Sequence, residues 1–492
     1  MSKSIVFRIT GILIVLFWFF VLAELVKRTH HSSTKGEFTH IDEEEEFDKD
    51  SEQWMDIFIR DRKVGYTHTR VKKVNEKIEV RERIFLVVNL MGATRRILSS
   101  TRAEVDERFL LENFDFSLSS ELINFKISGQ IEGNNLFLST GEKAKGETRL
   151  IRLPSRPMIN AGVTLFFRAH QLKVGNSFRF PLFDPVSMTT NPAIVKVVGK
   201  EAIELNGESY NAFRLEMSFL GRPLVFWLDE KGRSLKEEGF MGFTLVKSSQ
   251  SEALAGLDSL KKIDFYELSA IIAEKEIEGP RALSYLKVQL NQIPSSLPVD
   301  GVRQVLDGKI LKIIKETPPY EASYLIPYQG TDKELIENLE PEVLVQSKDE
   351  LIISAANKIV KGTTEPLKAA TMILGWVFEN VEKMPLISIP DAKEILTQRK
   401  GDCNEHATLL TALLRAVGIP ARIVVGLVYK DGKFYYHAWN EAYIRRWISM
   451  DATLNQMPAD ATHIKLINGG IEKQIQIIGM IGNLTLTVLD YR

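Results

Sequence analysis

Residues 399–420 read RKGDCNEHATLLTALLRAVGIP, and this segment predicts a buried helix that begins at the only cysteine of the chain, Cys403. Gly418 and Pro420 are typical of the end of such a helix. Apolar residues cover most of its circumference, as in a helix packed on all sides; they are Leu409, Leu410, Leu413, Leu414, Ala416 and Val417. The segment therefore predicts the central helix of a folded domain.

The position of Cys403 at a helix start has a chemical consequence. Unpaired backbone N–H groups and the positive end of the helix dipole meet the sulfur there, and both favour the thiolate. We therefore expect a lowered pKa for the Cys403 thiol. Position alone also fits an inert cysteine that packs as a small apolar side chain.

Two hairpins are predicted after the helix. A buried apolar run at 423–428 leads through the tight turn Asp431-Gly432 into a strand over residues 434–443. A second reversal precedes residues 447–453, WISMDAT. The strand over 434–443 presents His437 on one face, together with Trp439, Glu441 and Tyr443.

The length of the second loop decides whether a histidine and a carboxylate meet. With a three-residue loop over 444–446, Tyr443 pairs with Trp447, and Asp451 lies diagonally from His437 on the same face, within side-chain reach. With a two-residue loop, Asp451 turns to the opposite face of the sheet.

Cys403, His437 and Asp451 are the residue types of a Cys-His-Asp triad. The thiolate attacks a carbonyl group, the histidine takes and returns the proton, and the carboxylate fixes the imidazole tautomer. The backbone N–H of Cys403 is a natural donor to the oxyanion, and Gln398 is a candidate for the second donor. We expect the three triad residues to be catalytic.

Four sequence blocks, in order, closely resemble the core of the transglutaminase-like superfamily: Gly401-Asp402-Cys403, GIPAR at 418–422, HAWNE at 437–441 and WISMDAT at 447–453. The resemblance extends over residues 340–470. It implies a papain-like α+β scaffold and carries the roles of nucleophile, base and orienting acid over to Cys403, His437 and Asp451. The segment 456–466 is also similar to the tail of bacterial members.

Two departures from the family pattern are visible. Ala452 stands where the family usually has proline, and His406 is not part of the usual motif. We expect His406 and His463 to be packed structural residues. Glu405 or Glu441 could be a second acid, but we expect them to form ion pairs with Arg415 or Arg422.

Three helices are predicted upstream of the cysteine. Residues 347–350 have capping-box spacing before a helix at 351–360. Pro366 suits the first turn of a second helix that continues through Val377, and a third is expected at 390–398. These helices complete a predicted catalytic domain over residues 336–492.

The long middle of the chain predicts antiparallel sheet. Residues 53–264 alternate apolar and polar side chains, with hairpin signals at 133–135, 206–207 and 230–232. We expect a large β-rich domain, either a sandwich or a wide open barrel, in which His68 and His170 are surface or packed residues.

A smaller β/α segment is predicted over residues 265–335. Its expected parts are a helix near 266–276, a strand at 283–290 and a hairpin around Asp307-Gly308. The whole chain is thus predicted to be of the α+β class.

The first residues predict a membrane segment. Residues 9–23 carry no charge, and the length is that of a short span or of the apolar part of a signal peptide. We expect residues 1–28 to be an uncleaved single-pass anchor, with a cleaved signal as the alternative, and 29–52 to be an acidic spacer. Both alternatives place the bulk of the chain outside the cytoplasm, in the periplasm of a Gram-negative cell.

Composition excludes several classes of protein. Lys and Arg number 63 against 64 Asp and Glu, so no nucleic-acid partner is expected. A single cysteine excludes an intramolecular disulfide and any zinc site with two thiolates. A Cys403–His406 metal pair lacks further ligands, and no calcium loop is present, so neither cofactor nor metal is expected.

The sequence leaves three hypotheses for function. The first is a membrane-anchored thiol acyl-transfer enzyme of the cell envelope, acting on peptide or amide bonds of protein or wall peptide, with hydrolysis favoured over transfer to an amine. The second is a non-catalytic envelope binding or assembly module, and the third is a metal-dependent hydrolase. Oligomeric state and substrate are not readable from these residues.

Overall fold

The computed structural model describes residues 50–492 apart from 91–92, 121–123, 141–147, 220–221, 240–241, 258–263, 265–266, 268–269, 293–296, 320, 385–390, 471–472, 474–476 and 478–483. The expected anchor at 1–28 and nearly all of the acidic spacer lie outside these residues. Within the described part of the chain, no helix combines the length and apolar character needed to cross a membrane.

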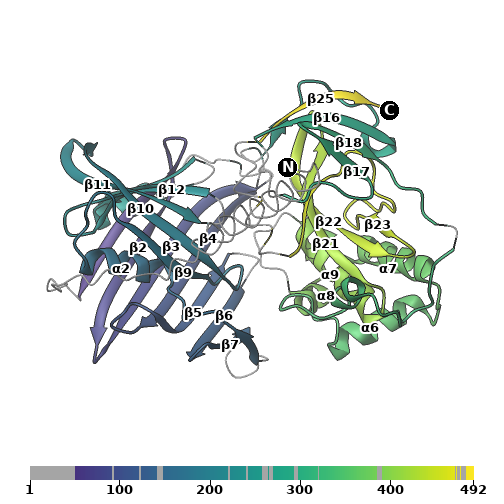
Figure 1. Ribbon diagram of the computed structural model, residues 1–492, viewed down its shortest axis with the longest axis horizontal. Coiled ribbons are helices and arrows are strands. Elements are labelled where there is room, and N and C mark those ends of the chain that lie inside the picture. The colour runs from purple at the N-terminus through teal and green to yellow at the C-terminus, as the bar shows by residue number, and fades with distance from the viewer. Residues whose placement is uncertain are drawn as a thin grey trace, which may run out of the picture. The chain divides into compact units, whose positions relative to one another are not determined.

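A single antiparallel sheet of 14 strands makes up the β-rich domain, in the order β8-β7-β6-β5-β4-β3-β2-β1-β14-β13-β12-β11-β10-β9 (Figure 1). Its first eight strands are β1 (Ser51–Ile59), β2 (Arg62–Val74), β3 (Lys77–Leu90), β4 (Ala93–Val105), β5 (Leu111–Ser119), β6 (Asn124–Glu132), β7 (Asn135–Thr140) and β8 (Thr148–Arg152). The others are β9 (Ser177–Asp184), β10 (Thr189–Leu205), β11 (Glu208–Phe219), β12 (Arg222–Leu228), β13 (Ser234–Glu238) and β14 (Phe243–Ser248).

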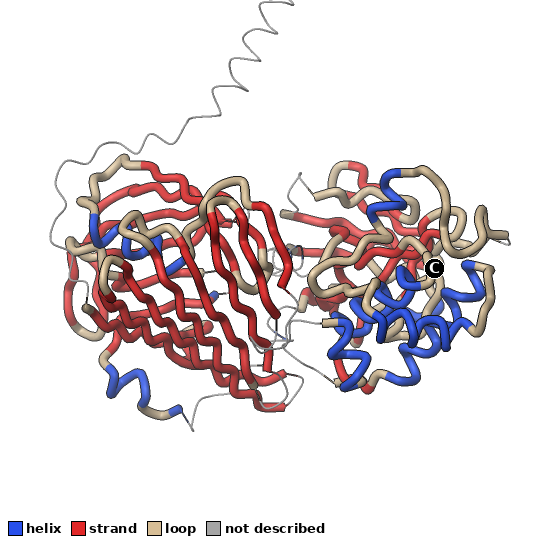
Figure 2. The backbone as a smooth tube through the Cα atoms, turned by 90° about the horizontal axis from the view of Figure 1, so that it is seen from below, coloured by secondary structure: helices blue, strands red, loops and turns tan. Residues whose placement is uncertain are grey.

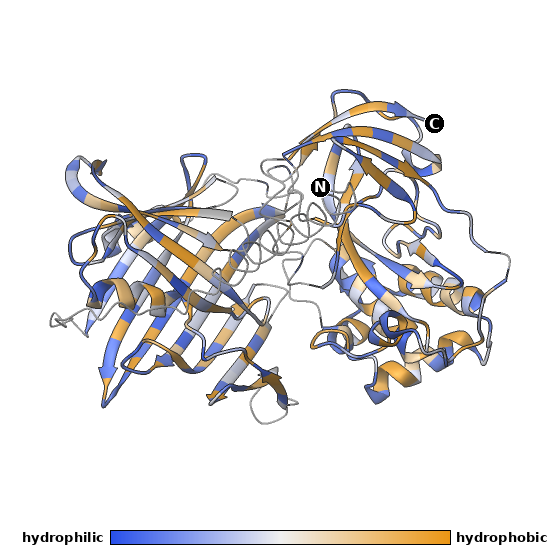
Figure 3. Ribbon diagram, viewed as in Figure 1, coloured by the Kyte–Doolittle hydropathy of each residue, from blue (hydrophilic) through white to orange (hydrophobic). Residues whose placement is uncertain are grey.

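The predicted hairpins of this sheet are confirmed. Asn206 and Gly207, with φ values of 52° and 81°, connect β10 to β11 through the pair Leu205 and Glu208. Such positive φ values at both turn residues match the twist of the strands that they join. In Figure 3, hydrophilic and hydrophobic residues alternate along strands of this sheet, as the period of two predicts.

The sandwich alternative is wrong, because one continuous sheet replaces two packed sheets. The sheet is curved in Figure 2, and helix α2 (Asn160–Ala169) packs against it. Phe166 and Phe167 of this helix contact the rings of Phe178 and Phe180 on β9. A short helix, α3 (Gln250–Leu254), follows the last strand.

A second, small antiparallel sheet joins distant parts of the chain in the order β17-β18-β16-β25. Its strands are β16 (Tyr285–Asn291), β17 (Gln304–Asp307), β18 (Ile310–Ile314) and β25 (Thr485–Tyr491), and the turn η3 (Pro280–Ala282) precedes β16. The predicted hairpin at Asp307-Gly308 is confirmed, since Asp307 pairs with Ile310. The helix expected near 266–276 is wrong from residue 270 onward, where β15 (Ile271–Ile272) pairs with β22 instead.

The carboxyl-terminal core contains a five-stranded sheet and a central helix. The sheet runs β15-β22-β21-β24, with β23 beside β22, and its strands are β21 (Ala421–Lys430), β22 (Lys433–Tyr443), β23 (Trp447–Met450) and β24 (Ile464–Asn468). The helices are α5 (Lys333–Glu337), α6 (Glu350–Val360), α7 (Pro366–Asn380), α8 (Ala392–Gln398) and α9 (Cys403–Ala416), with the short strands β19 (Glu382–Lys383) and β20 (Lys400–Gly401) between them. Strands from both sides of the expected boundary at 335/336 share hydrogen bonds and one hydrophobic core.

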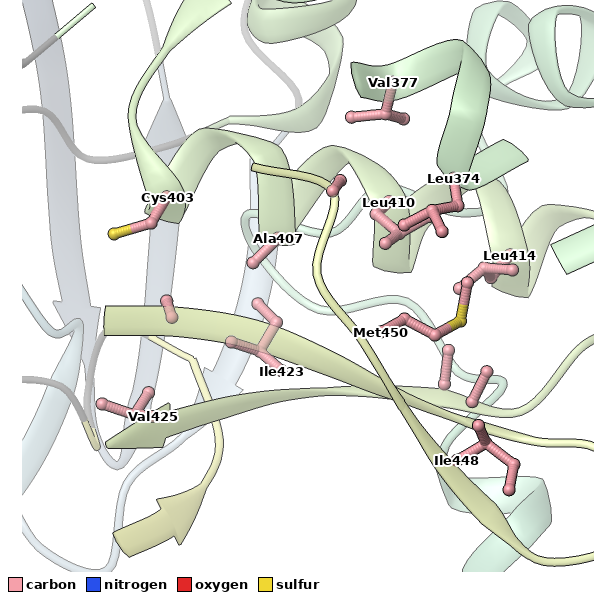
Figure 4. Packing of buried hydrophobic residues seen from close by; sticks show 14 of the residues in the cluster. Leu374, Val377, Cys403, Ala407, Leu410, Leu414, Ile423, Val425, Ile448 and Met450 are labelled. Atoms are coloured by element: carbon pink, nitrogen blue, oxygen red, sulfur yellow. The ribbon is translucent and has the colours of Figure 1, made fainter. Parts of the chain in front are cut away.

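Helix α9 lies at the centre of this core, as predicted. Figure 4 shows its Ala407, Leu410 and Leu414 facing side chains of α7, β21 and β23, with Cys403 at the amino-terminal end of the row. The upstream helices are also confirmed, although the capping residue of α6 is Asp349, which accepts a hydrogen bond from the Leu351 N–H, and not Ser347.

Candidate active site

The start of α9 is built around Cys403. The side chain of Asp402 accepts a hydrogen bond from the N–H of Asn404 at 2.9 Å, and the Asp402 N–H donates to Glu405 at 2.8 Å, which completes a capping box. Gly401 is needed at this approach, because a Cβ there would lie 2.2 Å from the Glu405 Cβ. The capping bonds go to residues on either side of Cys403, so its own N–H remains directed out of the helix end.

The Cys403 thiol does not have the lowered pKa that its position predicts. The residue is only 4% exposed, and burial raises its pKa well above the usual range. Asp402 raises it further, while a hydrogen bond from the backbone N–H of Ala438 acts in the opposite direction. The expected lowering of the Cys403 pKa by the helix amino terminus is therefore wrong, because the loss of solvation has the larger effect.

The register that brings a histidine and a carboxylate together is present. Tyr443 pairs with Trp447, so the loop between β22 and β23 is the three-residue loop. His437 Nε2 lies 2.7 Å from Oδ2 of Asp451, and both side chains are buried. The other carboxylate oxygen of Asp451 accepts hydrogen bonds from the backbone N–H groups of Thr453 at 2.7 Å and Leu454 at 3.0 Å.

A buried amide ties the histidine strand to the cysteine helix. Asn440 on β22 donates from Nδ2 to the carbonyl oxygen of Ala407 at 2.8 Å and to Oγ1 of Thr411 at 2.7 Å, both on α9. Together with the Ala438 N–H on the Cys403 thiol, these bonds hold α9 along β22. Cys403 and His437 are thus held by a helix and a strand that are hydrogen-bonded to each other.

His463 is the site residue that sequence reasoning missed. It was expected to be a packed residue, but its Nε2 lies 2.9 Å from the same Asp451 Oδ2 that contacts His437. Its Nδ1 faces Asp460 Oδ1 at 3.3 Å, and Asp460 is in turn bound by Arg281 at 2.9 Å. The signal available in the sequence was the similarity of residues 456–466 to the tail of family members, which contains both Asp460 and His463.

Rings pack around the two histidines. Trp439 is buried and stacks on His437, with 6.1 Å between the ring centroids. It packs edge to face with His463, with 5.2 Å between the ring centroids. The indole Nε1 of Trp439 is buried without a hydrogen-bond partner among the described residues. This apolar wall keeps water away from the imidazoles, which strengthens their bonds to Asp451.

The remaining predicted residues lie as follows. Gln398 is exposed, and its amide donates to Glu394 at 2.6 Å on the same helix, so its role as the second oxyanion donor stays a prediction. His406 is buried as expected, and its Nδ1 contacts the carbonyl oxygen of Asp402 at 2.7 Å.

The two glutamates differ in outcome. Glu441 forms the predicted ion pair with Arg422 at 2.7 Å, and Lys465 is a second partner at 2.8 Å. For Glu405 the expected arginine pair is replaced by the capping box with Asp402. Burial raises the pKa of Glu405 well above its usual range, and Asp402 adds to this shift.

His437, Asp451 and His463 offer ligand atoms within 4.8 Å of one another, which is close enough for a metal ion. However, one oxygen of Asp451 contacts both Nε2 atoms at hydrogen-bond distances of 2.7 and 2.9 Å. An N–H on each imidazole accounts for both contacts without an ion. The donor set therefore fits a hydrogen-bonded network better than a metal site.

One family model matches the segment that contains Cys403, His437 and Asp451. Residues 353–452 match the family described as the transglutaminase-like superfamily, which confirms the resemblance for this segment. An uncharacterized protein of Haemophilus influenzae is 30% identical over 135 residues, which cover 26% of this chain and 34% of the relative. The chain thus spans about a third of the length of the curated relative that it matches.

Two solved structures are similar to parts of this chain. A provisionally assigned cysteine protease from Cytophaga hutchinsonii is 20% identical, with a TM-score of 0.27, covering 43% of this chain and 87% of that chain. A provisionally assigned protease from Parabacteroides distasonis is 10% identical, with a TM-score of 0.21, covering 78% and 69%. At these identities and scores, the two structures add nothing to the assignment of an activity.

Proposed function

We propose that the carboxyl-terminal domain is a thiol acyl-transfer enzyme in which Cys403 is the nucleophile, His437 the base and Asp451 the orienting acid. The observation that carries this proposal is the 2.7 Å contact between His437 Nε2 and Asp451 Oδ2. Beside it, the thiol of Cys403 accepts a hydrogen bond from the N–H of Ala438, the residue that follows His437. The family match over residues 353–452 supports the same roles.

The contacts define a proton path. Because Asp451 accepts from Nε2 of His437, the opposite ring nitrogen, Nδ1, is the one left to take a proton from the thiol. Burial raises the pKa of Cys403, so the resting group is the thiol, and its proton moves to His437 as sulfur attacks the carbonyl carbon. The Cys403 N–H donates to the oxygen that becomes negative.

The second half of the reaction restores the thiol. The His437 imidazolium gives its proton to the leaving amine while the C–N bond breaks, which leaves a thioester on Cys403. A water molecule then loses a proton to Nδ1 and attacks the thioester carbon. The C–S bond breaks, sulfur recovers the proton, and a carboxylic acid leaves. An amine in place of water gives a new amide.

The substrate class proposed is a peptide or amide bond of protein or wall peptide, with hydrolysis favoured. Water is abundant outside the cytoplasm, and this location is supported by the uncharged segment at residues 9–23. We place the enzyme on a single-pass anchor with its bulk facing the envelope.

One observation favours the alternative, a non-catalytic envelope binding or assembly module. The sulfur of Cys403 is nearly enclosed, and its raised pKa keeps it protonated. In that case Cys403 packs as a small apolar side chain. The module would retain its function after Cys403→Ala, whereas the enzyme would lose it.

Thiol alkylation tests the proposed roles, because the full chain contains a single cysteine. We expect iodoacetamide to modify the detergent-solubilised wild type at least about tenfold faster near pH 7 than the His437→Ala variant, since the base is lost. His406→Gln, a change at another buried histidine, should retain the wild-type rate. Equal rates in wild type and His437→Ala would refute the enzyme.

A second measurement looks for the acyl intermediate. Incubation with p-nitrophenyl acetate should add one acetyl group to Cys403, visible by mass spectrometry after rapid acid quenching. The Cys403→Ala variant, treated in the same way, supplies the background. A wild-type mass that stays unchanged at every quench time contradicts the mechanism.

A further inference from the structure

Both ring nitrogens of His463 face hydrogen-bond acceptors. Nε2 lies 2.9 Å from Asp451 Oδ2, and Nδ1 lies 3.3 Å from both the carboxylate Oδ1 and the backbone carbonyl oxygen of Asp460. A neutral imidazole carries one N–H, and its other nitrogen is an acceptor, while an ionised carboxylate only accepts. If both carboxylates are ionised, both nitrogens of His463 must carry a proton.

The surroundings of the two carboxylates keep them ionised. Asp460 accepts from the Arg281 guanidinium at 2.9 Å, from the Thr462 N–H at 2.8 Å and from the Thr462 hydroxyl at 2.5 Å. Burial raises the pKa of Asp451, but its bonds to His437 and His463 outweigh this and hold it well below the usual range. For Asp460, His463, Thr462 and Arg281 likewise outweigh burial and lower the pKa.

The same contacts act on His463 in the opposite direction. Burial lowers the pKa of this fully enclosed imidazole, but the two aspartates outweigh the loss of solvation and raise it. Asp451, His463, Asp460 and Arg281 thus form a row of alternating charge, negative, positive, negative and positive. The charge of Asp451 is balanced before His437 receives any proton.

Among the residues that the structure describes, the other ionisable groups near Asp451 have different partners. Arg303 donates to the backbone carbonyl oxygen of Asp460 at 2.6 Å and pairs with Glu316 at 3.3 Å. Lys465 on β24, two residues after His463, is paired with Glu441. Trp439 presents only its ring to His463, and His406 contacts the Asp402 carbonyl. Within the described part of the chain, His437 and His463 are the two side chains that hydrogen-bond Asp451.

We propose that His463 is a buried imidazolium that holds Asp451 in place and compensates its charge, and that it thereby sets the pH range in which the Cys403–His437 pair reacts. This proposal rests on the function proposed above. His463 is a positioning residue, because it acts on the reacting atoms through Asp451. Its charge leaves His437 free to start the reaction as a neutral base.

The sign of the effect follows from electrostatics. His463→Gln retains an N–H donor but removes the positive charge of the imidazolium. The ring centroids of His463 and His437 are 5.7 Å apart. Protons then leave the Cys403–His437 pair less readily, so the pH profile of iodoacetamide alkylation should move to higher pH, by roughly one unit or more. On the acid side, one unit corresponds to about a tenfold slower rate.

The control is a second buried histidine that is neutral. His406 contacts the Asp402 carbonyl through Nδ1, and its Nε2 has no partner among the described residues. Burial lowers its pKa, so His406→Gln removes no charge at neutral pH, and its profile should overlie that of the wild type. A profile for His463→Gln that also overlies the wild type overturns the proposal.

A direct measurement guards against a His463 variant that does not fold. In the full chain labelled with ¹⁵N-histidine, one imidazole should keep the imidazolium chemical shifts to a higher pH than an ordinary histidine does. The Asp460→Asn change, which removes one flanking carboxylate, should lower the pH at which these shifts are lost. If instead every histidine titrates near its ordinary pKa of about 6.5, the proposal fails. Failure of the enzyme function alone leaves this imidazolium signal intact, whereas alkylation becomes independent of His437, so the two failures are distinguishable.

Discussion

The side-chain amide of Asn440 on β22 donates a hydrogen bond to Oγ1 of Thr411 on α9 at 2.7 Å, and both side chains are fully buried. The same nitrogen donates to the Ala407 carbonyl oxygen one turn earlier. The strand that carries His437 is therefore bonded to the helix that begins at Cys403. This contact makes the relative position of the two residues a property of the core and not of a loop.

Removal of this amide should loosen the site. We expect Asn440→Ala to lower the free energy of unfolding by about 2 kcal/mol, because a buried hydrogen bond is lost and the Ala407 carbonyl keeps fewer donors. Urea unfolding of the full chain measures this. The matched control is Asn338→Ala, whose amide contacts a carbonyl on the solvent side of α5 and whose loss should matter much less.

Asp451→Asn should slow the chemistry more than it changes the binding of a substrate. The amide leaves His437 without its charged partner and removes one of the two carboxylates that flank His463. We expect the alkylation rate of Cys403 at pH 7 to fall on the order of a hundredfold or more. A rate within twofold of the wild type, in a variant with an unchanged far-UV spectrum, contradicts the role of Asp451.

Stability should decline on both sides of neutral pH. The pKa values of Asp451 and Asp460 are depressed in the folded state, so their contribution is present above about 4 and is lost as the pH falls through the folded values. The pKa of His463 is raised, so its contribution is present below about 6.5 and is lost as the pH rises through its folded value.

The melting temperature, measured by calorimetry at a series of pH values, checks this predicted decline in stability. Asp460→Asn should flatten both limbs, because it removes one depressed carboxylate and one partner of His463. Asp332→Asn, at the exposed cap of α5, should leave the shape of the curve unchanged. A wild-type melting temperature that is constant from pH 3 to pH 9 would count against the buried charge row.

The buried Glu441–Lys465 pair supplies a separate test of charge burial. Burial raises the pKa of Glu441, but Lys465 and Arg422 outweigh it and lower the pKa overall. Glu441→Gln leaves Lys465 buried without a counter-ion and should destabilise the fold by about 3 kcal/mol or more. The double change Glu441→Leu with Lys465→Met should be much milder, because Lys465 no longer carries a charge and Arg422 keeps its ion pair with Glu334 at 2.8 Å. Chemical denaturation measures the free energy of unfolding of both variants. A double variant that is less stable than Glu441→Gln would contradict this prediction.

Chelation should leave the thiol chemistry unchanged. The hydrogen bonds of Asp451 to two imidazoles fit a network without a metal ion. We therefore expect the alkylation rate and the acetyl transfer to survive prolonged dialysis against EDTA. Loss of both, with recovery on adding zinc, would favour the metal-dependent hydrolase instead.

Local patterns were sufficient for much of the fold. The turn residues Asn206-Gly207 and Asp431-Gly432 predicted hairpins that are present, because positive φ values restrict the residues that such turns accept. The single sheet of 14 strands was not predictable in the same way. Alternation along a strand shows which face is apolar, but not which distant strand pairs with it, and β1 pairs with β14 nearly 200 residues later.

The same distinction between local and long-range features applies to the candidate site. Its local parts followed from the amino-acid sequence: Cys403 at a helix start, His437 on a strand and a loop length compatible with Asp451 on the same face. The tertiary structure alone decided that Asp451 contacts both His437 and His463, and that the Cys403 thiol is enclosed. The physical reason is that turns and periodicity act over a few residues, whereas solvation and the sharing of one carboxylate depend on how residues 452–463 fold back onto the sheet.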